Sequence, residues 1–274
     1  MIVELFGPSA AGKTTLARAL AGALQKAGCN VQLVASSRPA ECTQAGNETT
    51  TVFARSSPAL SAAVSRAAKF ASAVPVLLPG FPRDAITTEL MALLPPRGFL
   101  WSIRYRRYLS RLACAWNTAN ASEGIAIVDQ GFLSGLCSLF LLSRSSEPKL
   151  LERGLEFIPR PNLVIRLEAS RDVVEGRLLE RLRRQSAAER LFELDIEMNL
   201  KQIGIVRELA DILRKQGWPI MEVSCLDHRL LEKAVETVLE LAKSPDTTRN
   251  GRRAAEFRSV TPNSVDSVIA RATR

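Results

Sequence analysis

The sequence has a single histidine, His228, and aromatic side chains make up only 5% of its 274 residues. A lone histidine with no obvious nucleophile near it in the chain argues against a hydrolase that needs a catalytic histidine. The five cysteines are scattered and none forms a C-x-x-C pair, which argues against a zinc site or a disulfide framework. We therefore expect reduced, buried thiols and a core filled mainly by aliphatic side chains.

Long apolar runs are also missing. The N-terminal residues show no basic region followed by an apolar stretch, so no signal peptide is expected. The most apolar segment, 132–142, is much shorter than the ~20 residues that a membrane span needs. We expect it to form a buried helix, and the protein to be cytoplasmic with no membrane partner.

Acidic side chains are fewer than basic ones, 28 against 37, which gives a net charge of +9. The segment 244–274 supplies +3 of this charge and has no apolar periodicity, so we expect a domain over 1–243 and a disordered, basic C-terminal tail over 244–274. The remaining excess suits a phosphate-rich ligand and does not by itself indicate nucleic acid, which we do not expect as a partner. A homodimer is left open.

Short apolar runs that alternate with helical patterns predict an α/β domain with a doubly wound, five-stranded parallel sheet. The predicted strands are 2–6, 31–34, 125–128, 163–167 and 220–223. Besides 132–142 and a first helix after the Gly-rich segment 7–12, helices are predicted over 59–73, 85–94, 99–116, 171–185, 191–216 and 230–242.

One motif decides the functional interpretation, because it fits G-x-x-x-x-G-K-[ST] in full between a predicted strand and a predicted helix. Its residues are Gly7, Pro8, Ser9, Ala10, Ala11, Gly12, Lys13 and Thr14. The glycines let successive amides point at phosphate oxygens, and the following helix adds its positive N-terminal end. We expect Lys13 to bridge the β- and γ-phosphates, Thr14 to bind Mg²⁺, and Thr15 to cap the helix or touch the α-phosphate. ATP and Mg²⁺ are the expected ligands of this P-loop.

Asp129 ends a predicted strand at the edge of the sheet where ligands bind. A carboxylate there can hold Mg²⁺ or orient an acceptor hydroxyl, whereas the alternative is an aspartate that caps the next helix. The sequence has no N-K-x-D guanine signature, and Asp129-Gln130-Gly131 is not a D-x-x-G switch. A GTPase is therefore disfavoured.

The segment 3–41, with Arg38-Pro39-Ala40-Glu41 after the second strand, resembles the first βαβ unit of the thymidylate kinase-like branch of the nucleoside monophosphate kinases. Segments 163–184 and 220–241 are similar to that family's fourth strand with its lid-bearing helix and to its last strand and helix, and Asp129 matches its acidic residue after strand three. The resemblance implies an ATP-dependent small-molecule kinase that transfers the γ-phosphoryl group to a nucleotide, a nucleoside or another small hydroxyl or phosphate acceptor.

Three arginines, Arg177, Arg181 and Arg184, share one helical face. The resemblance implies that Arg177 packs on the adenine, that Arg181 reaches the phosphates, and that Arg183, Arg184 and Arg190 belong to a short lid. The expected catalytic residues are then Lys13, Asp129, Arg181 and Arg184, with Thr14 and Asp129 at the metal. A solvated helix face with pairs such as Glu180–Arg184 is the alternative.

Two positions depart from the family pattern, because Ser9 replaces an aspartate and Gln130 replaces an arginine that holds an acceptor phosphate. A nucleoside, a sugar or another metabolite hydroxyl is therefore a serious alternative to thymidylate.

The acceptor side is expected to be helical. In segment 99–111 the side chains of Arg104, Arg107 and Arg111 share a face with Tyr108, one turn after Trp101, and would border the acceptor pocket. Plain packing and contact with a polyanion or a membrane surface are the competing interpretations. Arg83 and Asp84 are further acceptor candidates. For the whole chain, the alternatives are a P-loop ATPase switch, a nucleic-acid-associated NTPase, or a regulatory module that binds nucleotide without transfer.

Overall fold

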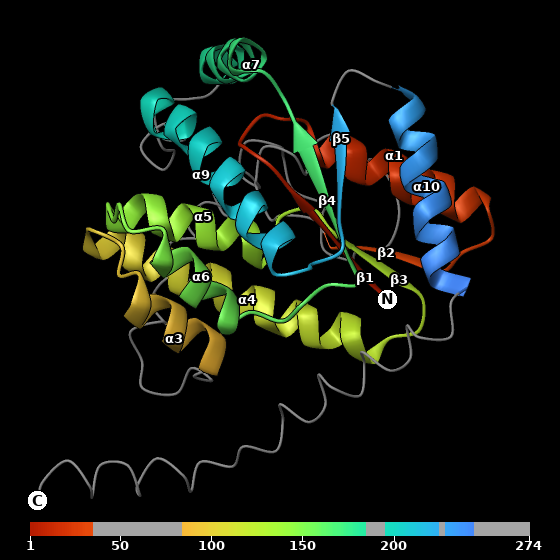
Figure 1. The fold of residues 1–274 in the computed structure, drawn as a ribbon, viewed down its shortest axis with the longest axis horizontal. Helices are drawn as coiled ribbons and strands as arrows, with labels where there is room; N and C mark the ends of the chain where they lie inside the picture. Colours follow the sequence, from red (N-terminus) through yellow and green to blue (C-terminus); the bar gives the residue numbers. More distant parts are fainter. Residues whose placement is uncertain (35–83, 185–194, 225–227, 244–274) are drawn as a thin grey trace, which may run out of the picture.

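A computed structural model describes residues 1–34, 84–184, 195–224 and 228–243 (Figure 1). The predicted helix over 59–73, the start of the helix predicted over 191–216, Arg83, Arg190, the segment 38–41 and the tail 244–274 lie outside the described residues.

Five strands form one parallel sheet in the order β2-β3-β1-β4-β5. Their bounds are β1 Ile2–Phe6, β2 Val31–Val34, β3 Ile125–Val128, β4 Leu163–Glu168 and β5 Ile220–Ser224. The central strand β1 pairs with β3 on one side and with β4 on the other. The predicted α/β class and all five predicted strands are confirmed.

Helices cover both faces of this sheet (Figure 1). The helices of the described residues are α1 Lys13–Lys26, α3 Ala85–Leu93, α4 Phe99–Ala121, α5 Phe132–Ser143, α6 Lys149–Glu156, α7 Arg171–Arg184, α9 Ile196–Lys215 and α10 His228–Lys243. The short helix α6 was not predicted, and α4 runs beyond the predicted end because Trp116 and Ala119 are buried. Among the described segments, no helix is long and apolar enough to cross a bilayer.

Two apolar cores lie on opposite faces of the sheet because successive side chains of a strand point to opposite sides. Val3 and Leu5 of β1 pack in the core shared with α1 and α10, whereas Ile2 and Phe6 pack in the larger core that includes α4, α5 and α9. Glu4 is the exception on β1, because its carboxyl group points to the larger core and the residue is 0% exposed.

Candidate nucleotide-binding site

The P-loop joins the carboxyl end of β1 to the start of α1. Ala10 has φ 61° and Gly12 has φ 102°, so two residues of the loop take the left-handed region, a pattern that forms anion-binding concavities. Gly7 lies so close to β4 that a Cβ atom there would stand 2.8 Å from the carbonyl oxygen of Leu167. The loop therefore requires glycine at its first position.

Lys13 is buried at the start of α1, with its Nζ inside the P-loop. The ammonium group donates to the carbonyl oxygens of Gly7 at 2.9 Å and of Pro8 at 2.7 Å. These two carbonyl groups of the loop backbone therefore stabilise the charge of Lys13, and the curved path of the loop brings them close to each other. Thr15, two residues further along α1, is exposed.

The Thr14 hydroxyl donates to Oδ2 of Asp129 at 2.7 Å. Asp129 follows β3, the neighbour of β1, so the two residues meet at the carboxyl edge of the sheet. Asp129 is 1% exposed, and its other oxygen, Oδ1, is buried with no hydrogen-bond partner. This pair combines a carboxylate and a hydroxyl, oxygen ligands of the type that Mg²⁺ prefers.

The residues around this pair fit a metal that is held largely by a bound triphosphate. Among the described residues, no group of three or more His, Cys, Asp and Glu side chains is arranged to hold a metal alone. Mg²⁺ usually takes one or two protein ligands together with substrate phosphates and water. Thr14 and Asp129 could supply those two ligands.

Glu4, and not Asp129, contacts the N-terminus of α5. Its Oε1 accepts a hydrogen bond from the backbone N–H of Leu133 at 2.7 Å, and the N-cap residue of the helix is Gly131. A Cβ atom at Gly131 would lie 2.3 Å from the carboxyl carbon of Glu4, so the close approach requires glycine. Burial raises the pKa of Glu4 to about 8, although the Leu133 hydrogen bond opposes the shift. Glu4 therefore takes the position at the N-terminus of α5 that the capping alternative gave to Asp129.

Arg177 reaches the P-loop from α7. Its Nη1 donates to the carbonyl oxygens of Ala10 at 3.2 Å and of Ala11 at 3.0 Å. Arg181 is half-buried one turn later, whereas the Arg184 side chain is 77% exposed and forms an ion pair with Glu180. Of the three arginines predicted to share a face, Arg177 is therefore held against the loop by two hydrogen bonds.

Gln202 of α9 also contacts the P-loop, and sequence reasoning missed it. Its Oε1 accepts hydrogen bonds from the backbone N–H of Ser9 at 3.1 Å and from the Ser9 hydroxyl at 3.0 Å. Gln202 and Asn199 are buried on the same face of α9 as Val206 and Leu209. Two amide side chains that interrupt an apolar stripe were a signal that could have identified this contact.

An aromatic row on α4 leads to the turn after β3. The rings of Trp101 and Tyr105 lie 6.1 Å apart, and those of Tyr105 and Tyr108 lie 5.9 Å apart. The Tyr108 hydroxyl donates to the carbonyl oxygens of Gln130 at 3.0 Å and Gly131 at 3.2 Å. The first half of α4 therefore adjoins the turn that carries Asp129.

The charged side chains predicted for the acceptor side differ from one another in their contacts and in their exposure. Arg104 lies over the Trp101 ring, 5.1 Å from its centre. Arg107 is half-buried and Arg111 is exposed. Asp84 is the N-cap of α3, where its Oδ1 accepts from the backbone N–H of Thr87 at 2.7 Å.

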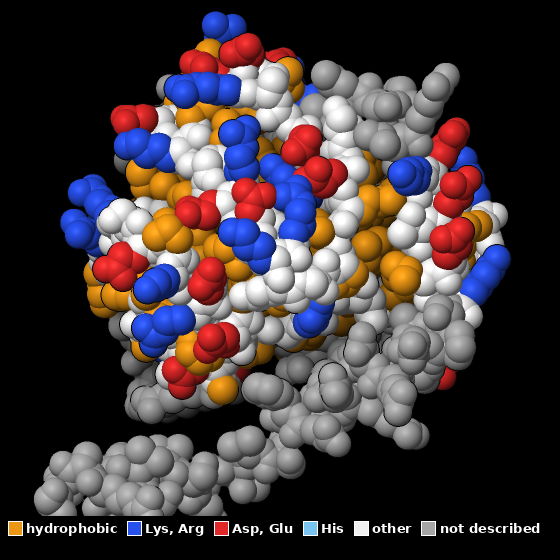
Figure 2. Space-filling model, in the orientation of Figure 1, with side chains coloured by type: hydrophobic (Ala, Val, Ile, Leu, Met, Phe, Trp, Pro, Cys, Tyr) orange, Lys and Arg blue, Asp and Glu red, His pale blue; other side chains and the backbone are white. Residues whose placement is uncertain are grey.

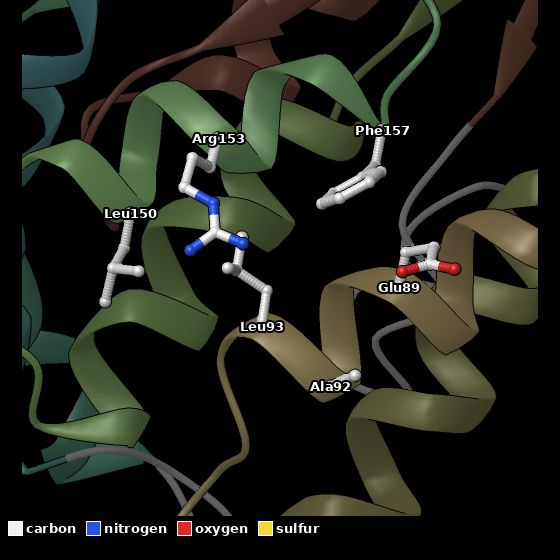
Figure 3. A pocket seen from close by; sticks show the side chains of 6 residues that line it. All are labelled: Glu89, Ala92, Leu93, Leu150, Arg153 and Phe157. Carbon is white, nitrogen blue, oxygen red and sulfur yellow. The ribbon is translucent and has the colours of Figure 1, made fainter. Parts of the chain in front are cut away.

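A surface hollow of about 360 Å³ lies away from these residues, between α3 and α6 (Figure 3). It is lined by Glu89, Ala92, Leu93, Leu150, Arg153 and Phe157, none of which belongs to the P-loop or the turn after β3. On the face drawn in Figure 2, basic and acidic side chains are interspersed.

Comparisons with known proteins give a similarity in fold only. No protein-family model and no curated protein matches the sequence. Three solved structures of deoxyadenosine kinase from M. mycoides are similar. The one with dCMP and dCDP has a TM-score of 0.44 at 13% identity over 88% of this chain and 97% of that chain. The dATP complex has a TM-score of 0.43 at 13% identity, over 89% of this chain and 100% of that chain. The dCTP complex has a TM-score of 0.44 at 12% identity, over 88% of this chain and 99% of that chain. A similarity of this size carries no inference about activity or substrate.

Proposed function

We propose that this protein is a Mg²⁺-dependent phosphotransferase that moves the γ-phosphoryl group of ATP to a small acceptor. The observation that carries the proposal is the hydrogen bond from the Thr14 hydroxyl to Asp129, whose second carboxylate oxygen is buried and unpartnered beside a complete P-loop. A carboxylate is expensive to bury unless it is paired or binds a metal, so this arrangement favours a cation at that oxygen.

The proposed reaction needs positioning and charge neutralisation rather than a covalent intermediate. The acceptor oxygen forms a bond to the γ-phosphorus while the bond from that phosphorus to the β–γ bridging oxygen breaks, ADP leaves, and the acceptor proton is released to solvent. Lys13 would hold the β- and γ-phosphate oxygens, and Thr14 and Asp129 would hold the metal. Bound Mg²⁺ supplies charge neutralisation at the phosphates. Arg177, Arg181 and Arg184 are the proposed arginine side chains around the nucleotide.

The acceptor is proposed to bind beside the first half of α4. The aromatic row from Trp101 to Tyr108 approaches the turn after β3, and a planar or sugar-bearing ligand could stack there. Gln130 has no positive charge to hold an acceptor phosphate, which favours a neutral, hydroxyl-bearing acceptor such as a nucleoside or a sugar. The thymidylate kinase-like relationship remains a prediction from the sequence.

Calorimetry followed by a transfer assay tests the proposal. The wild type is expected to bind ATP only with Mg²⁺, Lys13→Ala to bind MgATP about a hundredfold more weakly because it loses charged hydrogen bonds to the phosphates, and Lys26→Ala, at the exposed end of α1, to bind normally. Mass spectrometry of a nucleoside, nucleotide and sugar panel with ATP should then show one product heavier by a phosphoryl group. Absence of Mg²⁺-dependent binding would overturn the proposal entirely. ATP hydrolysis stimulated by DNA or RNA, without a phosphorylated small molecule, would replace it with the ATPase alternative.

A further inference from the structure

Gln202 holds the P-loop from the side of α9. The residue is 5% exposed, and both ends of its amide are engaged. Oε1 accepts from the N–H and hydroxyl of Ser9, and Nε2 donates to the Ser138 hydroxyl of α5 at 3.3 Å. The Ser138 hydroxyl in turn donates to the carbonyl oxygen of Ser134 at 2.9 Å.

The orientation of this amide is determined by its partners. Were the Gln202 amide rotated by half a turn, its NH₂ group would face the backbone N–H of Ser9, and two donors would oppose each other. The Ser138 hydroxyl would also have to give up its bond to Ser134 to serve the exchanged oxygen. Gln202 therefore presents an acceptor to the P-loop.

The bond to Ser9 has a consequence for Lys13. The N–H of Ser9 and the C=O of Pro8 belong to one planar, trans peptide unit, so they point in opposite directions. Gln202 accepts from the N–H of this unit at 3.1 Å, and Lys13 Nζ donates to its C=O at 2.7 Å. This peptide plane is thus held by Gln202 on its N–H side, and on its C=O side the Pro8 oxygen accepts from Lys13 and from the backbone N–H of Ala11 at 3.3 Å.

From this geometry we infer that Gln202 is a positioning residue, which fixes the Pro8–Ser9 peptide and through it the ammonium group of Lys13. The inference rests on the proposed function, because it assigns Gln202 a role in holding the group that would bind the β- and γ-phosphates. Loss of the acceptor leaves the Ser9 N–H without this partner and loosens the peptide plane, which weakens the hold on the Pro8 carbonyl, a carbonyl to which Lys13 donates.

The second half of the P-loop has its own support. Arg177 of α7 donates to the carbonyl oxygens of Ala10 and Ala11, and α7 packs against α9 (Figure 1). The contacts of Arg177 do not involve the Pro8–Ser9 peptide. Removal of Gln202 is therefore expected to act on the Pro8–Ser9 half of the loop, and removal of Arg177 on the Ala10–Ala11 half.

Nucleotide binding by the full chain tests the inference. Gln202→Met keeps a similar volume without hydrogen bonds, and Gln202→Ala removes the same acceptor if the longer side chain disturbs folding. Lys201→Met is the matched control, because Lys201 is the exposed neighbour on α9 and pairs along the helix with Glu197. We expect Gln202→Met to weaken MgATP binding about tenfold, as the loss of one or two buried hydrogen bonds would, and to leave AMP binding unchanged because AMP lacks the β- and γ-phosphates.

A double-mutant cycle with Lys13 distinguishes a positioning role from a purely structural one, because a purely structural effect of Gln202→Met would be the same with and without Lys13. With the triphosphate as ligand, Gln202→Met should have no further effect in a Lys13→Ala background. The inference is overturned if the wild type binds MgATP but Gln202→Met and Gln202→Ala bind it equally well. Equal losses for AMP and ATP, or a loss of the same size with and without Lys13, would also overturn it. A wild type that binds no MgATP would instead refute the proposed function and this inference with it.

Discussion

The hydroxyl of Thr14 and the carboxylate of Asp129 are joined by a 2.7 Å hydrogen bond, although 115 positions separate them in the chain. They meet because β1 and β3 are neighbours in the sheet and each residue follows the carboxyl end of its strand. One oxygen of the carboxylate is used by this bond and the other is buried without a partner. The first prediction concerns this second oxygen.

Asp129→Asn is expected to lower ATP turnover by about 10²–10³-fold, because the amide keeps the shape of the side chain but removes the charge that would hold the metal. The Mg²⁺ concentration needed for half-maximal activity should also rise. Turnover measured across a Mg²⁺ titration checks this prediction. Asp211→Asn, on the exposed side of α9, should leave both quantities unchanged, and an unaltered Mg²⁺ dependence in Asp129→Asn would contradict the assignment.

Arg177→Met is expected to reduce the affinity for MgATP about tenfold, because two carbonyl groups of the P-loop lose a charged donor. Since these contacts are to the loop and not to a base, the affinity for inorganic triphosphate should fall in parallel. Calorimetry with both ligands checks this, with Arg171→Met at the exposed start of α7 as the control. A loss seen for ATP alone would instead support packing on the adenine, as the family resemblance implies.

Ala10→Gly should be nearly neutral for stability and nucleotide binding. The left-handed conformation of Ala10, with φ 61°, costs about 1 kcal/mol, and the greater flexibility of unfolded glycine offsets a similar amount. Ala10→Val should lower both the melting temperature and the affinity, because a β-branched residue tolerates positive φ poorly. Ala92→Val on the exposed side of α3 controls for the added volume. Equal melting temperatures for the valine variant and the wild type would show that the loop does not need this conformation.

Because the pKa of Glu4 is raised, we expect the free energy of unfolding to fall as the pH rises. Its pKa is about 8 in the fold against an ordinary value of 4.5, so between these values the folded state keeps a proton that the unfolded state has lost. The unfolded state binds fewer protons in that window, and the free energy of unfolding therefore decreases with increasing pH, by up to several kcal/mol for one fully buried carboxyl.

Glu4→Gln isolates this effect, because the neutral amide resembles the protonated carboxyl and can still accept from Leu133. Urea unfolding of both proteins at pH 5 and pH 8.5 is the measurement. The two should be similar at the lower pH, and the variant should be the more stable at the higher pH. The same slope with pH in both proteins would mean that Glu4 is not the group responsible.

The parts of the molecule that local patterns determine could be predicted from the sequence. All five strands are short, mostly apolar stretches, and the P-loop has its own residue signature. Asp129 was identified because the carboxyl ends of parallel strands share one edge, so its neighbourhood follows from the fold class.

Contacts that depend on which helices and strands lie side by side could not be predicted from the sequence. The contact between Ser9 and Gln202 spans 193 positions and exists only because α9 packs over the loop. Glu4 sits in an apolar run, and nothing local indicates that its carboxyl group meets the start of α5. For Arg184, helical spacing predicts that it shares a face with Arg177 but not how far its side chain lies from the loop, and in the structure it is exposed and pairs with Glu180.

The order of the strands has a consequence for biosynthesis. β1 leaves the ribosome first, yet Val3 pairs with Ile127 and Leu163, which are translated much later. The nascent chain must therefore keep β1 without either neighbour until β3 has emerged and without its second neighbour until β4 has emerged, and a nucleotide added before β3 emerges would find no Thr14–Asp129 pair. Truncated nascent chains ending before residue 163 should depend on chaperones to stay unaggregated.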